Sequence, residues 1–180
     1  MKATGIVRRI DDLGRIVIPK EIRRTLRIRE GDPLEIFTDR EGKVILKKYS
    51  PIGELGTLAG IYADSLSKTL GCTVCITDMD QVIAAAGNGK KELQEMLLSA
   101  ELAEVFQERK TVLKKSSDAE FVAITKDRSE YSEEIISVIL SEGDIAGGVI
   151  FLQKNEKKHF GEMEKKFAAG AADLLGRQLS

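Results

Sequence analysis

The first hydrophobic block of the chain is Ile16-Val17-Ile18, three β-branched residues with no polar position between them. Such a run predicts a short strand that is covered on both faces. Turn-forming residues precede it at 11–14, and Pro19 ends it and favours the start of a helix. A helix of little more than two turns is therefore expected over 20–27.

Three further strands are expected in the first fifty residues, at 3–10, 34–37 and 43–47, with a hairpin turn at 39–42. About fifty residues bury little more than half of their extended-chain surface, so this unit needs additional stabilisation. It contains no cysteine or zinc motif, which leaves association with a second chain. A partner chain would also cover the second face of Ile16-Val17-Ile18.

From residue 52 the apolar spacing becomes helical. Apolar residues recur at alternating intervals of three and four, as in a coiled-coil seam of about two heptads. They are Ile52, Leu55, Ala59, Tyr62 and Leu66. This predicted helix either pairs with the same helix of a second chain or packs on its own domain.

The rest of the chain alternates short strands and helices. Strands are expected at 72–77, 81–86, 112–113, 121–125, 135–140 and 145–152, and helices at 91–98, 101–109 and 161–179. The last helix carries an apolar stripe at Phe160, Met163, Phe167, Ala171 and Leu174. If this stripe and the helix from residue 52 join two dimers, the protein is a tetramer.

Composition and charge divide the chain near Pro51. Of 180 residues, 42% are hydrophobic and 32% charged, as in an ordinary globular protein, and no apolar run reaches the length of a membrane span. The net charge is +5 over residues 1–50 and −6 over residues 51–180. We therefore expect two domains, 1–50 and 51–180, in a cytoplasmic protein whose basic first domain binds a polyanion.

Five segments of the first domain form one continuous pattern: Thr4-Gly5-Ile6-Val7-Arg8, Leu13-Gly14-Arg15-Ile16-Val17-Ile18-Pro19, Arg23-Arg24-Thr25-Leu26, Leu34-Glu35-Ile36 and Val44-Ile45-Leu46-Lys47-Lys48-Tyr49. This pattern resembles the AbrB family of transition-state regulators. The resemblance implies a mainly-β, swapped-hairpin dimer that binds double-stranded DNA. It also implies that Arg8, Arg15, Arg23 and Arg24 contact the DNA, eight arginines in a dimer.

Arginine suits this role because its planar fork of donors stays charged and fits phosphates and guanine edges. On charge alone, a solvated basic surface explains these arginines equally well. Strand parity does not decide between Arg8 and Arg9, and the choice of Arg8 follows the family. Lys2, Arg9 and Lys47 are further candidates for phosphate contacts.

The second domain resembles a GAF domain, an α+β fold with flanking helices, above all in the hairpin over 136–150. An AbrB-like head followed by such a tail implies a sporulation regulator, an activator or a repressor, at the nucleoid of the forespore. GAF domains often bind small molecules, but this chain does not identify a ligand. Asn88 to Lys91 could hold an anion at a helix start, although a capped surface turn explains them as well.

Catalytic and metal-binding motifs are absent from the sequence. Cys72 and Cys75 have the C-x-x-C spacing, but in a strand this spacing places them on opposite faces. His159 is the single histidine, whereas a zinc site needs about four ligands. We expect structural cysteines, no metal, no cofactor and no enzymatic activity. The rival function is an antitoxin-like module that binds a protein, but the tail is too apolar for the disordered segment this would require.

Overall fold

The computed structural model describes residues 4–126, 131–154 and 157–179. The chain divides into two compact units, Met1–Tyr49 and Ser50–Ser180, here called the head and the tail. Each unit is described by itself.

The head contains helix α1 (Lys20–Thr25) and a hairpin of strands β1 (Leu34–Thr38) and β2 (Val44–Lys48). The strands pair antiparallel, with Leu34 opposite Lys48 and Thr38 opposite Val44. In the turn between them, Asp39 Oδ1 accepts hydrogen bonds from the backbone N–H groups of Glu41 and Lys43, both at 2.9 Å. The predicted hairpin over 34–47 is therefore confirmed.

The two strands expected before α1 are wrong for a single chain. The first is expected at residues 3–10, where residue 3 lies outside the described residues and residues 4–10 form no strand. The second is expected at residues 15–18, which form no strand either. Ile16 and Val17 are 53% and 73% exposed, so the run expected to be covered on both faces is open. The physical reason is that a strand needs a neighbour, and β1 and β2 already pair with each other within the chain.

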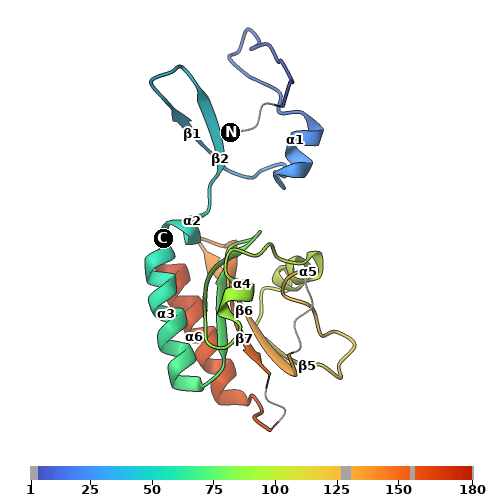
Figure 1. Cartoon of the computed structure of the whole chain (residues 1–180), viewed down its shortest axis with the longest axis vertical. Coiled ribbons are helices and arrows are strands. Elements are labelled where there is room, and N and C mark those ends of the chain that lie inside the picture. Colours follow the sequence, from blue (N-terminus) through green and yellow to red (C-terminus); the bar gives the residue numbers. More distant parts are fainter. Residues whose placement is uncertain (1–3, 127–130, 155–156, 180) are drawn as a thin grey trace. The chain divides into compact units, whose positions relative to one another are not determined.

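The tail is built on a five-stranded antiparallel sheet in the order β4-β3-β7-β6-β5. Its strands are β3 (Thr73–Thr77), β4 (Val82–Ala86), β5 (Val112–Lys115), β6 (Glu133–Ser141) and β7 (Asp144–Gln153). Its helices are α2 (Pro51–Glu54), α3 (Gly56–Leu70), α4 (Lys90–Leu93), α5 (Ala100–Gln107) and α6 (Glu162–Gln178). The long helices α3 and α6 lie side by side along one face of the sheet (Figure 1).

Two apolar clusters fill the two faces of this sheet. The cluster under α3 and α6 includes Ile135, Phe151 and Leu175, and the cluster under α4 and α5 includes Phe106, Ile136 and Ile150. Alternate residues of β6 thus face opposite layers, as the two-residue repeat of a strand requires.

The two cysteines follow the same alternation. Cys72 belongs to the α3–α6 cluster and Cys75 to the α4–α5 cluster, and both are buried, free thiols. Burial raises the pKa of both thiols to about 12. This confirms the interpretation of both as structural residues.

The helix expected at 91–98 is shorter in the structure, because α4 ends at Leu93. Gln94 leaves the helix, and its side chain accepts a hydrogen bond from Ala85 N at 3.0 Å and donates one to Ile83 O at 2.8 Å. Glu95 N then donates to Val82 O at 3.1 Å. The helix therefore ends where the side chain of Gln94 and the backbone N–H of Glu95 form hydrogen bonds to the edge strand β4.

The strand expected at 121–125 is also wrong. This segment makes one isolated bridge, from Thr125 to Leu98. The backbone N–H of Val122 donates instead to the side chain of Glu134, at 3.1 Å. The side chain of Glu134 on β6 therefore satisfies the backbone N–H of Val122 without any strand pairing.

The predicted seam from residue 52 is divided between α2 and α3, which meet at Leu55. Ile52 and Ala59 are fully buried in the tail's own core, and Tyr62 and Leu66 pack against it. Of the two interpretations, packing on the same domain is the one that the single chain shows.

Candidate nucleic-acid interface and association surface

Asp11 organises the turn that carries Arg15, one of the four arginines predicted to contact DNA. Its Oδ1 accepts hydrogen bonds from the backbone N–H of Leu13 at 3.0 Å and of Arg15 at 2.7 Å. Backbone hydrogen bonds from Asp11 N to Arg15 O and from Gly14 N to Asp11 O, both 3.0 Å, close the turn. Gly14 has a φ of +74°, which an L side chain rarely adopts.

The same carboxylate holds the side chain of Arg15. Arg15 Nε donates to Asp11 Oδ2 at 2.8 Å, although both side chains are well exposed. The backbone N–H of Arg15, followed by its guanidinium, holds the pKa of Asp11 below its usual range. Asp11 therefore stays ionised at neutral pH, and the orientation of Arg15 is fixed within its own turn.

Arg23 is held in a similar way by a backbone group. Its Nε donates to the carbonyl oxygen of Ile18 at 3.2 Å. Within the described residues, neither Arg15 nor Arg23 uses its two terminal nitrogens, Nη1 and Nη2, in a hydrogen bond. In both arginines, Nη1 and Nη2 are thus available to donate hydrogen bonds to a ligand.

The other predicted contacts lie on the surface of the head or outside the described residues. Arg8, Arg9, Arg24 and Lys47 are exposed. Lys2 lies outside the described residues. Arg15, Arg23 and Arg24 follow one another from the turn through α1, whereas Arg8 lies before the turn, outside any helix or strand.

Lys48 is a head residue that the sequence did not single out. Its Nζ lies 2.9 Å from Asp32 Oδ2 and donates to Arg27 O at 3.3 Å, which ties the loop after α1 to β2. Burial raises the pKa of Asp32, but the Arg29 N–H and the Lys48 ammonium outweigh it, so the pKa lies below its usual value. No spacing rule predicts this contact, because the two residues lie far apart in the sequence.

In the tail, an apolar groove runs between α3 and α6, with a volume of about 490 Å³. Its lining consists of Tyr62, Leu66, Met163, Lys166, Phe167, Gly170, Ala171 and Leu174. Met163, Phe167 and Leu174, three members of the predicted stripe, are 61%, 43% and 38% exposed, whereas Phe160 is buried. The tail's own core instead uses Ala168, Ala172 and Leu175 of α6.

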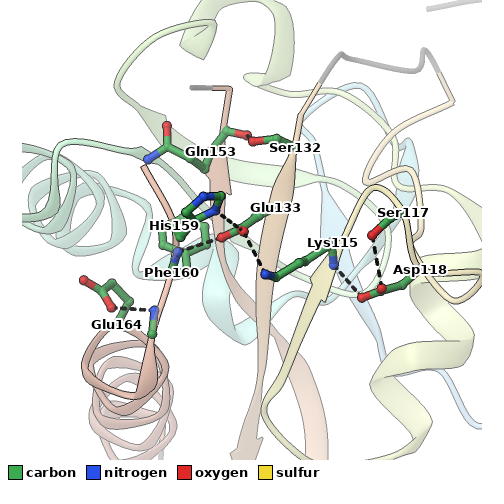
Figure 2. A network of polar contacts seen from close by, with 10 residues as sticks. Lys115, Ser117, Asp118, Ser132, Glu133, Gln153, His159, Phe160 and Glu164 are labelled. Atoms are coloured by element: carbon green, nitrogen blue, oxygen red, sulfur yellow. Dashed lines mark hydrogen bonds and ion pairs between the residues drawn. The ribbon is translucent and has the colours of Figure 1, made fainter. Parts of the chain in front are cut away.

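A polar network fixes the start of α6 to the sheet (Figure 2). Glu133 on β6 accepts a hydrogen bond from Phe160 N at 2.6 Å, bonds His159 Nδ1 at 2.7 Å, and lies 3.7 Å from Lys115 Nζ. Burial raises the pKa of Glu133, but the Phe160 N–H, His159 and Lys115 outweigh it, so the pKa lies below its usual value. His159 thus helps to hold the start of α6 against β6.

Its neighbour Glu134 lies on the opposite face of β6 and is fully buried. Oε1 accepts the Val122 N–H, while Oε2 has no hydrogen-bond partner within the described residues. Lys114, also buried, is paired with Glu134 across the β5–β6 ladder. Burial raises the pKa of Glu134 to about 7, against the opposing effects of Val122 N and Lys114.

The segment Asn88 to Lys91 shows no built anion site. The helix that it opens has four residues, and its N-cap, Gly89, is left-handed with no side-chain cap. Within the described ranges, no helix is long and apolar enough to cross a membrane.

Known proteins are similar in sequence to both the head and the tail of this chain. A family model described as "Stage V sporulation protein T C-terminal, transcription factor" matches residues 54–180, and one described as "Antidote-toxin recognition MazE, bacterial antitoxin" matches residues 7–54. The chain is 51% identical to stage V sporulation protein T of Bacillus subtilis over 99% of both chains. It is 44% identical to the transition state regulatory protein AbrB of the same organism, over 52% of this chain and 98% of AbrB.

Among solved structures, the second GAF domain of DevS from Mycobacterium smegmatis is similar to the tail. Its TM-score is 0.55 at 12% identity, and the match covers 72% of this chain and 93% of that one. At this identity the likeness establishes the fold alone. The predicted combination of an AbrB-like head and a GAF-like tail is thereby confirmed.

Proposed function

The chain belongs to the stage V sporulation protein T family of transcription factors, and from this premise we propose that it binds double-stranded DNA through Arg8, Arg15, Arg23 and Arg24. That family consists of regulators, so the chain is a sporulation transcription regulator and not an enzyme. It activates or represses its target genes by occupying DNA near them, in the cytoplasm at the nucleoid of the forespore. Arg9, Lys47 and Lys2 add phosphate contacts.

One observation supports this proposal most directly. Arg15 and Arg23 are anchored through Nε, so each offers its terminal nitrogens in a defined orientation. A guanidinium oriented in this way can donate two parallel hydrogen bonds to guanine or to a phosphate. A merely solvated basic surface does not need such anchoring.

Single alanine variants of the full chain test the proposal. Arg8→Ala, Arg15→Ala, Arg23→Ala and Arg24→Ala should each weaken binding to a DNA duplex selected by the wild-type chain, by about 1–3 kcal/mol for a contact to a base edge. Arg40→Ala, in the exposed turn between β1 and β2, is the matched control and should bind as the wild type does. Normal binding by all four variants would refute the proposed interface.

We further propose that the head is a domain-swapped dimer and that the tails join two such dimers into a tetramer. The exposed Ile16 and Val17 support the first step, because a second chain would cover them. The exposed Met163 and Phe167 beside the α3–α6 groove support the second. In a tetramer the second pair of heads binds DNA at a high effective concentration.

We also propose that the tail senses a small molecule, and this proposal rests on Glu134. A buried carboxylate oxygen without a partner in the described part of the tail can receive a hydrogen bond from a small polar molecule. A ligand that binds the folded tail should raise its melting temperature. A metabolite mixture that never changes the melting temperature of the wild type would leave oligomerisation as the role of the tail.

The antitoxin-like alternative is supported by the family model that matches residues 7–54. An antitoxin of that kind needs a disordered tail, whereas the described residues of the tail form a sheet covered by helices on both faces. Limited proteolysis distinguishes the two functions. A regulator with a folded tail should yield a resistant fragment of the size of residues 50–180, and an antitoxin-like chain should lose its tail quickly.

A further inference from the structure

An acidic residue lies within the proposed DNA-binding segment, where a negative charge should repel phosphates. Asp11 is 40% exposed in its side chain, and Arg15 is 69% exposed. An exposed ion pair of this kind contributes little to stability. Its geometry is nevertheless well defined, because both carboxylate oxygens of Asp11 accept hydrogen bonds from nearby residues.

The two oxygens of Asp11 have separate tasks. Oδ1 accepts the backbone N–H groups of Leu13 and Arg15, and these bonds build the turn. Oδ2 accepts Arg15 Nε at 2.8 Å, and this bond orients the guanidinium. The turn would keep its two acceptor bonds if Oδ2 were replaced by an amide nitrogen.

We propose that Asp11 is a positioning residue for sequence-specific DNA recognition: it fixes the fork of Arg15 so that Nη1 and Nη2 fit a base edge. This inference rests on the proposed function, because it requires Arg15 to contact DNA. Asp11 itself touches no DNA. Its negative charge lowers the affinity for any duplex slightly, and its hydrogen bond raises the preference for the right one.

The physical basis is the difference between positioning and attraction. Attraction to phosphates depends on charge and does not distinguish sequences. Discrimination between bases depends on bidentate geometry. A free guanidinium keeps its charge but loses rotamer freedom on binding, so fixing it beforehand favours the bidentate contact. Arg23 obtains the same fixation from the Ile18 carbonyl, which no side-chain substitution removes.

The test compares Asp11→Asn with Asp12→Asn in the full chain. Asp12 is an exposed neighbour in the same turn, so both variants remove one negative charge at nearly the same place. Affinity is measured for a duplex selected from a random pool by the wild-type chain, and for a random-sequence duplex of equal length. Melting temperature is measured alongside, and the asparagine side chain in Asp11→Asn retains Oδ1 for the turn.

We expect Asp11→Asn to reduce the ratio of selected to random affinity by about fivefold or more, without weakening binding to random DNA. Asp12→Asn should leave the ratio unchanged. In an Arg15→Ala background, Asp11→Asn should no longer change the ratio, because Asp11 acts through Arg15. These three results together support the positioning role.

Equal ratios for Asp11→Asn and Asp12→Asn would overturn the inference and leave Asp11 as a turn residue. A uniform loss of affinity for both duplexes, with a lower melting temperature, would overturn it as well. If Arg15→Ala binds both duplexes normally, Arg15 does not contact DNA, and the premise taken from the proposed function is wrong for this residue. That outcome is distinguishable from a failure of Asp11 alone.

Discussion

Val122 donates its backbone N–H to Glu134 Oε1 at 3.1 Å, and the carboxyl group that accepts it is fully buried. This bond ties the irregular segment 121–125 to β6. Burial raises the pKa of Glu134 to about 7, so the bond is made at neutral pH by a group that is partly protonated.

The first prediction concerns the pH dependence of folding. The folded pKa of Glu134 is raised above its ordinary value of 4.5, so its contribution to stability is complete below about pH 4.5 and is lost as the pH rises through about 7. Relative to Glu134→Gln, the wild type should lose roughly 3 kcal/mol of unfolding free energy over that window. Urea denaturation at intervals of pH measures the difference.

Glu133 provides a control of opposite sign on the same strand. Its pKa is lowered in the folded protein, so its contribution is present above the unfolded value and is lost as the pH falls through the folded pKa. Relative to Glu133→Gln, the wild type should therefore lose stability on acidification. If Glu134→Gln and the wild type show parallel pH profiles, the buried carboxyl does not titrate as described.

The second prediction concerns salt. Neutralised phosphates release counterions, so a dimer with eight arginine contacts should show a log–log slope of affinity against salt of up to roughly −7. Arg24→Ala removes two proposed phosphate contacts per dimer and should reduce the slope by about 2, whereas Arg15→Ala, which removes a base-edge contact, should change it less. Fluorescence anisotropy between about 50 and 200 mM salt measures both slopes. A slope near zero for the wild type would contradict recognition through phosphates.

The third prediction concerns the head. Ile16 and Val17 are exposed in one chain, so covering them requires a second chain and makes folding depend on concentration. Residues 1–50 should sediment as a dimer whose melting temperature rises with protein concentration. Val17→Asp should abolish the dimer, whereas Arg40→Ala, in the exposed turn between β1 and β2, should keep it. A folded monomer of residues 1–50 would disprove the swapped arrangement.

The fourth prediction concerns the groove between α3 and α6. Phe167→Glu places a charge on its rim and should convert the proposed tetramer into a dimer, with weaker binding to DNA. Ile61→Glu makes the same change at a 61% exposed position on α3 that does not line the groove. This variant should keep the wild-type mass. Light scattering measures the mass of the wild type and of both variants. A wild-type full-length chain that is a dimer would rule out the tetramer.

Features that depend on local sequence could be predicted. The hairpin of β1 and β2 follows from its turn residues and alternation, and the placement of Cys72 and Cys75 on opposite faces follows from strand geometry. The turn that carries Arg15 follows from Asp11 and Gly14. The ion pair between Asp11 and Arg15 does not, because several rotamers of both side chains fit such a turn.

Features that depend on distant groups could not be predicted. The helix at Leu93 ends because the edge of β4 offers hydrogen bonds to Gln94, and the strand at 121–125 is replaced by a bond to Glu134. The strands expected before α1 are wrong for a third reason. Within the described residues of the single chain they have no strand to pair with, and propensity does not say where a partner would come from.

The side-chain amide of Gln94 has one more consequence. By bonding Ala85 N and Ile83 O, it closes the outer edge of β4, which would otherwise be a template for another strand. The opposite edge, β5, carries Lys114 and Lys115, which oppose the approach of a second edge. Growth by edge-to-edge pairing into fibres is thereby disfavoured. The helical face that carries the α3–α6 groove is therefore the surface through which we expect copies of the tail to associate.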